Sequence, residues 1–151
     1  MNDVSVASLE DLPALMSLED AFPASQRWSE NSWREELTAD NRHVLVCGGG
    51  GAVEAAATFA VADDVVDLHR IVTADTARRR GLARHLMVAG IRWAQGQGAS
   101  RMLLEVEHTN GAALALYATQ GFLPIAERRD YYGPGAHAVI LQRSMSEGEQ
   151  S

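Results

Sequence analysis

The chain has 151 residues and a mass of 16.3 kDa, with 46% hydrophobic and 22% charged residues. This composition is typical of one globular domain with a buried core, and it excludes disordered, collagen-like and low-complexity chains. Every basic residue is an arginine, and 13 arginines against 20 acidic residues give a formal net charge of −7. Such an acidic chain is not expected to bind nucleic acid directly, because it repels the phosphate backbone.

The cysteine content and the chain ends give further expectations. A single cysteine, Cys47, predicts neither an internal disulfide nor a cysteine-rich zinc site. The first residues lack the basic and apolar regions of a signal peptide, and no apolar run approaches the roughly 20 residues that span a bilayer. We therefore expect a cytoplasmic protein with no membrane partner. Residues 1–143 are expected to form the domain, and the polar residues 144–151 a fraying tail.

The first half of the chain predicts mostly strands. Residues 3–6 alternate like a strand, and two helices follow, one introduced by a capping box of Ser8 and Asp11 and one capped by Ser29. Runs compatible with β-structure at 43–47, 52–61 and 64–72 predict a three-stranded meander. Four consecutive glycines at 48–51 join the first two of these strands and indicate a flexible hairpin turn.

The second half alternates helices and strands. A 3.6-residue period begins at Gly81 and stops near Gly98, and it predicts a long helix. A strand at 101–107, a helix at 111–120 and closing strands at 123–129 and 136–143 follow. This order favours a single α/β (α+β) domain with a mixed, mostly antiparallel sheet flanked by helices, and not a doubly wound parallel sheet.

A basic turn precedes the long helix. Residues 78–84 read Arg-Arg-Arg-Gly-Leu-Ala-Arg. The first N–H groups of a helix have no intrahelical partner and carry the positive end of the helix dipole, so they can bind a phosphate or pyrophosphate. Gly81 and Ala83 would let such a ligand approach the backbone. From spacing alone, a solvated basic turn is an equally good interpretation, and neither the Walker nor the dinucleotide fingerprint is present.

This turn carries a resemblance to a known family. The pattern Arg78-x-x-Gly81-x-Ala83 resembles the acyl-CoA pyrophosphate loop of the GCN5-related N-acetyltransferase (GNAT) superfamily. Leu104-Glu105-Val106, Asn110, Ala115-Leu116-Tyr117 and Gly121-Phe122 resemble superfamily features in the expected order. Segments 27–30, 104–117 and 128–132 are similar to the ribosomal-protein-alanine N-acetyltransferases of the RimI type, and the likeness runs from residue 4 to residue 143.

The resemblance implies an activity and a site. The implied enzyme transfers an acetyl group from acetyl-CoA to a protein N-terminal α-amine, with the N-terminal alanine of a small-subunit ribosomal protein as the preferred acceptor. It implies Glu105 as the proton acceptor and Tyr117 as the proton donor. It also implies that the cofactor is held by Ile71, Val72, Thr73, Arg79, Arg80, Gly81, Leu82, Ala83, Arg84 and Asn110.

The residues make independent sense of these two roles. Glu105 lies in an otherwise apolar strand, so its carboxylate must reach an open cleft or bear a desolvation cost. A peptide α-amine, with a pKa of about 7.7 to 8.0, is far easier to deprotonate than a lysine. Tyr117 can protonate the departing thiolate as a neutral phenol. A surface carboxylate and a tyrosine that only packs are the simpler alternatives for the two residues.

Other features bear on partners. The five histidines show no metal-ligand spacing, so no metal site is predicted; His69 could line the acceptor cleft, although a core or rim position is the simpler interpretation. Five acidic residues flank the expected acceptor channel and would attract a basic N-terminal peptide if they gather there: Asp63, Asp64, Asp67, Glu105 and Glu107. Acetylation of other N-termini or small amines, or a CoA-binding module without turnover, are the alternative functions. The sequence does not indicate an oligomeric state.

Overall fold

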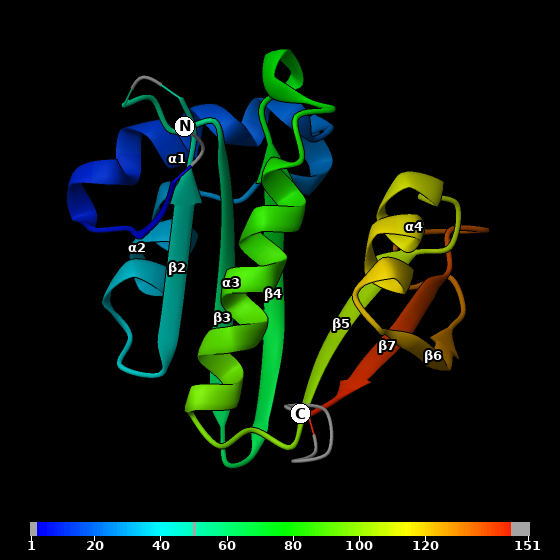
Figure 1. The fold of residues 1–151 in the computed structure, drawn as a ribbon. Coiled ribbons are helices and arrows are strands. Elements are labelled where there is room, and N and C mark those ends of the chain that lie inside the picture. The colour runs from blue at the N-terminus through cyan, green and yellow to red at the C-terminus, as the bar shows by residue number, and fades with distance from the viewer. Residues whose placement is uncertain (1–2, 50, 146–151) are drawn as a thin grey trace.

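The structure, a computed structural model, describes residues 3–49 and 51–145. These residues form one seven-stranded sheet in the order β1-β2-β3-β4-β5-β7-β6, with helices on both faces (Figure 1). From β1 to β7, the strands are Val4–Val6, Arg42–Cys47, Ala55–Ala62, Val65–Thr73, Arg101–Glu107, Leu123–Arg128 and Ala138–Ser144. Among these described strands, only β4 and β5 pair in parallel. The predicted α/β domain with a mixed, mostly antiparallel sheet is confirmed.

The part of the chain that the structure describes has four α-helices, and they lie where the capping signals and the periodicity predict them. They are α1 at Leu12–Leu18, α2 at Glu30–Thr38, α3 at Leu82–Gly96 and α4 at Gly111–Thr119. The predicted caps form: the Ser8 N–H donates to Asp11 Oδ2 at 2.9 Å, and Ser29 Oγ accepts from the Ser32 N–H at 3.1 Å. These bonds satisfy backbone donors that would otherwise have no partner at the helix starts.

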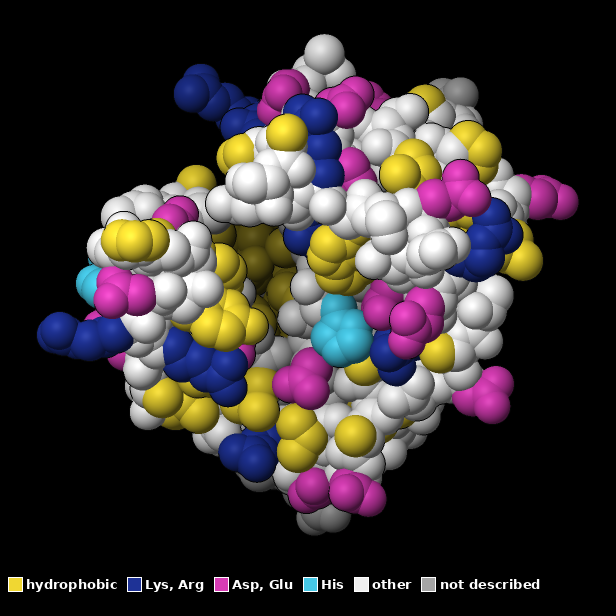
Figure 2. All heavy atoms as spheres, turned by 180° about the vertical axis from the view of Figure 1, so that it is seen from behind, with side chains coloured by type: hydrophobic (Ala, Val, Ile, Leu, Met, Phe, Trp, Pro, Cys, Tyr) yellow, Lys and Arg dark blue, Asp and Glu magenta, His cyan; other side chains and the backbone are white. Residues whose placement is uncertain are grey.

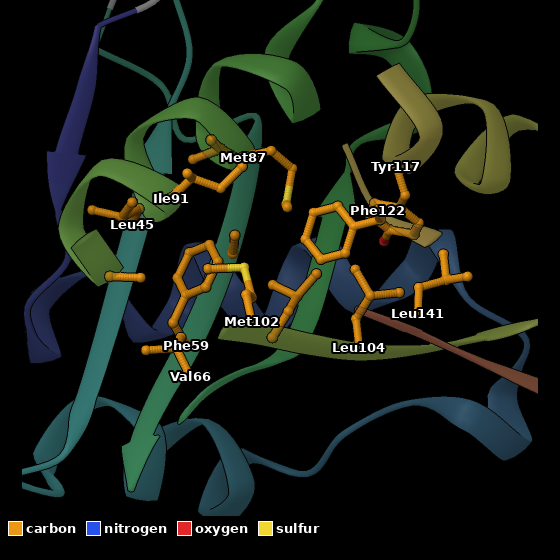
Figure 3. Close-up of a cluster of buried hydrophobic side chains, with 14 of the residues drawn as sticks. Leu45, Phe59, Val66, Met87, Ile91, Met102, Leu104, Tyr117, Phe122 and Leu141 are labelled. Atoms are coloured by element: carbon orange, nitrogen blue, oxygen red, sulfur yellow. The ribbon is translucent and has the colours of Figure 1, made fainter. Parts of the chain in front are cut away.

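The sheet divides the core into two layers. Helices α3 and α4 cover one face, where Phe59, Met102 and Leu104 belong to the larger apolar cluster (Figure 3). Helices α1 and α2 cover the other face, where Trp33 and Val44 are buried. Because successive strand residues point to opposite faces, a strand buried on both sides must be apolar along its length, as β2 is from residue 44 to residue 47.

Several predicted strand and helix ends shift by one or two residues in the structure, and two differences have a clear structural cause. The strand expected at 52–61 begins at Ala55, because the chain before it stays in a loop where the Glu54 carboxylate accepts from the Gly49 N–H and pairs with Arg80. Two residues assigned to the tail belong to the fold: Ser144 ends β7, and Met145 is buried while its N–H donates to the Ser100 carbonyl. The rest of the predicted tail, 146–151, lies outside the described residues.

The feature that shapes the site is the divergence of β4 from β5. Their pairing covers only Val65–Arg101, Val66–Met102 and Asp67–Leu103. Two residues further along β4, His69 forms a β-bulge: Thr58 of β3 pairs with Arg70 and Phe59 pairs with Leu68, so the residue between them has no partner in β3. A bulge bends its strand and increases its twist. Beyond this point β4 and β5 separate, and the sheet is split at one end (Figure 1).

Within the described residues, no helix combines the length and the apolar composition needed to cross a membrane.

Helix α3 contains a glycine whose replacement tests the packing. A Cβ at Gly90 would overlap the Phe59 ring, whereas a Cβ at Gly96, in the same helix, would meet nothing within 4 Å. We expect Gly90→Ala to lower the free energy of unfolding by about 1–3 kcal/mol through overpacking, despite its better helix propensity. Gly96→Ala should leave it unchanged or raise it by up to about 1 kcal/mol. Urea unfolding of both variants checks this, and equal effects would contradict the packing described.

Candidate active site

Two adjoining cavities open where β4 and β5 diverge. The gap cavity, of about 470 Å³, lies between the diverging strands and reaches α4, with Ile71, Val106 and Tyr117 in its wall. The rim cavity, of about 690 Å³, lies beside it, with Trp28 and Tyr131 in its wall. Figure 2 shows this side of the molecule as a deep hollow with apolar side chains inside and charged side chains around it. Five residues line both cavities: Leu68, His69, Arg70, Glu105 and Tyr132.

Strand alternation on β5 places Glu105 at the junction of the cavities. Met102, Leu104 and Val106 point into the core, so Glu105 points to the opposite face. Its side chain is 31% exposed, and its Oε1 lies 3.4 Å from Nη1 of Arg128 on β6. The carboxylate thus meets an open cavity, as the sequence analysis expects of a charged residue in this strand.

Tyr117 lies on α4 and lines the gap cavity together with Glu105. Its residue is 4% exposed, and its ring packs edge-on against Phe122, with ring centroids 5.9 Å apart (Figure 3). Burial raises the pKa of Tyr117 well above its usual value, and Tyr132 adds to the rise. The phenol therefore keeps its proton at neutral pH and can donate it.

Tyr132 belongs to the loop between β6 and β7, and it interacts electrostatically with both Glu105 and Tyr117. Burial raises its pKa, and the charge of Glu105 raises it further. Tyr131 stands edge-on to it, with ring centroids 5.0 Å apart. This loop therefore brings aromatic side chains over the cavity wall formed by β5.

Two residues of the basic turn have a left-handed backbone conformation. Arg79 and Gly81 both have left-handed conformations, with φ of 67° and 76°, and Gly81 precedes the first residue of α3. The residue at the N-cap position is Gly81, so no side chain of that residue caps this helix. The first N–H groups of α3 therefore face outward from a turn next to the split end of the sheet, where they can bind an anion.

The arginine side chains of this turn differ in their ion pairing and in their exposure to solvent. Arg80 forms a two-pronged ion pair with Glu54, at 2.8 and 3.0 Å, and the hydrogen bonds from Arg80 lower the pKa of the Glu54 carboxyl. Arg79 and Arg84 are exposed. The charge of Arg80 is therefore partly neutralised by the protein itself.

The second half of β4 has an edge that faces the gap. Ile71, Val72 and Thr73 pair with β3 on one side, while the described pairing with β5 ends at Asp67. Backbone polar groups along this edge can bind an extended ligand as a strand would. Across the gap, Asn110 lines the same cavity, and its Oδ1 accepts the N–H of Ala113 as the cap of α4.

Buried polar residues that the sequence analysis did not assign to the site contact residues that line its cavities. Glu19, 2% exposed, pairs with Arg70 at 2.7 Å. Glu36 of α2, 7% exposed, accepts from Thr58 and lies 3.0 Å from Nδ1 of His69. Glu36 lies one turn after the buried Trp33, and this position of a carboxylate on an apolar helix stripe is the signal that could have identified it.

The five acidic residues expected around an acceptor channel do not all gather. Asp67 and Glu105 line the rim cavity, and Glu107 lines the gap cavity. Asp63 and Asp64 instead form the turn between β3 and β4, at the end of the sheet where β4 and β5 are still paired. Asp64 accepts a hydrogen bond from Ser100 Oγ at 2.7 Å, which gives it a structural role.

Among residues 3–49 and 51–145, no group of three or more His, Cys, Asp or Glu side chains is arranged to hold a metal ion. The chemical groups of the site include a carboxylate, a protonated phenol, an imidazole, a strand edge and a helix start.

Comparison with known proteins identifies the fold and the family. The acetyltransferase (GNAT) family model matches residues 9–122. The [ribosomal protein bS18]-alanine N-acetyltransferase of Salmonella typhimurium is 34% identical over 143 residues, which cover 87% of this chain and 88% of that protein. The N-alpha-acetyltransferase RimI of Mycobacterium tuberculosis is 28% identical, with 81% of this chain and 78% of that protein covered.

A solved structure supports the same family assignment. The crystal structure of the ribosomal-protein-S18-alanine N-acetyltransferase from Escherichia coli superposes with a TM-score of 0.88 at 30% identity, over 97% of this chain and 96% of that one. The resemblance carried by the basic turn and the motifs after it is thereby confirmed, and the chain belongs to the acetyltransferase (GNAT) family.

Proposed function

We propose that the protein transfers an acetyl group from acetyl-CoA to the N-terminal α-amine of a protein, with the N-terminal alanine of a small-subunit ribosomal protein as its acceptor. One observation carries the proposal: Glu105 and Tyr117, the proton acceptor and donor that such a transfer needs, line the same cavity where the sheet splits. The 34% identity to a protein named for this acceptor supports the choice of substrate. The cytoplasmic location expected from the sequence is part of the proposal.

The chain offers a binding surface that fits acetyl-CoA. In this proposal the gap-facing edge of Ile71, Val72 and Thr73 binds the pantetheine arm through backbone hydrogen bonds. The N–H groups from Arg79 to Arg84, including those of Arg80, Gly81, Leu82 and Ala83, bind the diphosphate at the start of α3. Asn110 uses its Oδ1 as a helix cap, so its amide N–H₂ is the group we assign to the cofactor.

The proposed chemistry divides two proton transfers between two residues. Glu105 accepts a proton from the attacking amine, directly or through a water molecule. Its place at the junction of both cavities supports this role, because the acceptor and the acetyl donor are proposed to meet there. Tyr117 gives its proton to the departing thiolate. The phenol is protonated at neutral pH, as an ordinary tyrosine is, and burial, which raises its pKa, keeps it so.

The rim cavity is the proposed entrance for the peptide. Trp28 and Tyr131 provide apolar surface there, and Asp67 and Glu105 provide negative charge. A basic N-terminal segment would be attracted to these carboxylates. Asp63 and Asp64 are not included, since neither lines this cavity.

Substitution of the two proposed catalytic residues tests the chemistry. Glu105→Gln and Tyr117→Phe should each lower kcat by about 100-fold, because each removes one proton transfer while keeping the shape of the side chain. The dissociation constant for acetyl-CoA should change less than about threefold, because neither group is assigned to cofactor binding. Transfer is measured by intact mass with a peptide that begins with alanine, and binding by calorimetry.

Glu127→Gln is the control, because Glu127 is exposed on β6 and lines neither cavity. Normal turnover in both site variants would contradict the assigned roles. Tight acetyl-CoA binding with no transfer by the unmodified protein to any amine would instead favour a binding module.

The anion-binding turn is tested by two matched glycine substitutions. Gly81 and Gly98 have φ of 76° and 78°, and a Cβ at either would meet nothing within 4 Å. Replacing either with alanine therefore costs a similar amount, about 1 kcal/mol of backbone strain. Only Gly81→Ala places a methyl group where the diphosphate is proposed to lie, so only this variant should weaken acetyl-CoA binding, by about tenfold or more. Equal affinities of the two variants would exclude this turn as the diphosphate site.

A further inference from the structure

A histidine lies across the split sheet from Glu105. His69 of β4 lines both the gap cavity and the rim cavity, as Glu105 does from β5. The bulge places it there: the residues on either side pair with β3, whereas His69 itself does not. Its side chain is 31% exposed, so the ring is held by the protein and still reaches solvent.

Glu36 fixes the orientation of this ring. Nδ1 of His69 lies 3.0 Å from Oε1 and 3.3 Å from Oε2 of Glu36. Burial raises the pKa of Glu36, but hydrogen bonds with His69, Thr58 and Arg42 lower it by more, so the carboxyl is ionised. An ionised carboxylate only accepts hydrogen bonds, and Nδ1 must therefore carry the proton. In the neutral ring this leaves the lone pair on Nε2, which is a base.

Glu36 does not need His69 as a partner. Arg42 Nε lies 3.0 Å from Oε2 and pairs its charge, and Thr58 Oγ1 donates to Oε1 at 2.7 Å. The carboxylate is thus paired and hydrogen-bonded within the protein before the histidine is counted. The contact is better explained as Glu36 orienting His69 than as the reverse.

The proposed reaction includes a second proton transfer that a second base can carry out. An α-ammonium ion carries two protons more than the nitrogen of the amide product, so two protons must leave the nitrogen in each turnover. An ordinary imidazole, with a pKa of about 6.5, takes a proton from an α-ammonium ion about 100-fold more readily than an ordinary glutamate with a pKa of about 4.3. The cavities that hold Glu105 also hold the His69 imidazole, a group of the chemical type that suits the first of these two protons.

We propose that His69, oriented by Glu36, is a second proton acceptor of this enzyme and converts the acceptor's α-ammonium ion into the nucleophilic amine. Nε2 of His69 takes the first proton and releases it to solvent. The amine then forms the N–C bond, Glu105 takes the second proton, the C–S bond breaks, and the thiolate takes the proton of Tyr117. The proton on Glu105 returns to the phenolate, so each turnover releases one proton overall.

Glu36 acts through His69 and is a positioning residue. This inference rests on the proposed function. The other charged or titratable groups that line one or both of these cavities are Asp67, Arg70, Arg78, Glu105, Glu107, Tyr117, Arg128, Tyr131 and Tyr132.

The test compares two variants that both lose the base. His69→Asn retains an N–H₂ group that can donate to Glu36 in place of Nδ1–H, whereas His69→Ala does not. If the histidine is a proton acceptor, both variants should lower kcat/KM for an alanine-starting peptide by about tenfold or more at pH 7. The loss should shrink to less than about threefold at pH 9.5, where the peptide amine, with a pKa of about 7.7 to 8.0, is already deprotonated. The dissociation constant for acetyl-CoA should be unchanged.

Four results separate the possibilities. Full activity of His69→Asn at pH 7, or a loss of the same size at pH 7 and pH 9.5, would overturn the inference, since a structural contact does not depend on the protonation of the peptide. Glu36→Gln keeps an acceptor for Nδ1 and should give a smaller loss with the same pH trend; a loss without that trend would remove its positioning role. Absence of transfer by the unmodified protein would instead reject the proposed function.

Discussion

The site depends on one constraint in the sheet: β4 and β5 pair over three residues and then separate. A parallel sheet normally continues its hydrogen bonds along the whole strand, so an interrupted pair leaves backbone groups without a strand partner. Here the pairing of β4 with β5 stops at Asp67, just before the bulge at His69. The side chains that line the resulting opening include Glu105 and Tyr117. The cavities, the exposed strand edge and the meeting of the proposed catalytic residues all follow from that separation.

Buried ionic contacts on the α1 and α2 side anchor the bent strand. Glu19 accepts from Arg70 of β4, from the indole N–H of Trp33 and from the N–H of Trp28, which ties the end of α1 to the start of α2 and to the strand. The guanidinium of Arg70 also lies 3.8 Å from the centre of the Phe22 ring. One position earlier on β4, His69 is tied to α2 through Glu36. Breaking such a pair by removing one partner is costly, because the remaining charge stays buried.

The sequence predicted the elements well because each has a local cause. Neighbouring residues determine the caps at Ser8 and Ser29, the helical period after Gly81 and the alternation around Glu105. Each of these features matches the structure. The resemblance added the family, which no periodicity could supply. The sequence did not reveal the bulge at His69, because a bulge depends on the register between two strands.

For the same reason, the contact between Glu36 and His69 was not predicted. These residues are 33 positions apart, and only the packing of α2 against the sheet brings them together. Residues that are close in the chain can also lie apart in the structure. Asp63 and Asp64 are close to Asp67 in sequence, yet they lie in the turn between β3 and β4 and line neither cavity. Proximity in sequence is a poor guide to a site that is formed between strands.

A crystal structure of the protein with coenzyme A bound tests the central claim most directly. The account predicts the pantetheine arm between β4 and β5, paired with the backbone of residues 71–73, and the diphosphate on the N–H groups that begin α3. Coenzyme A bound at any other surface, with the opening between the two strands empty, would contradict it.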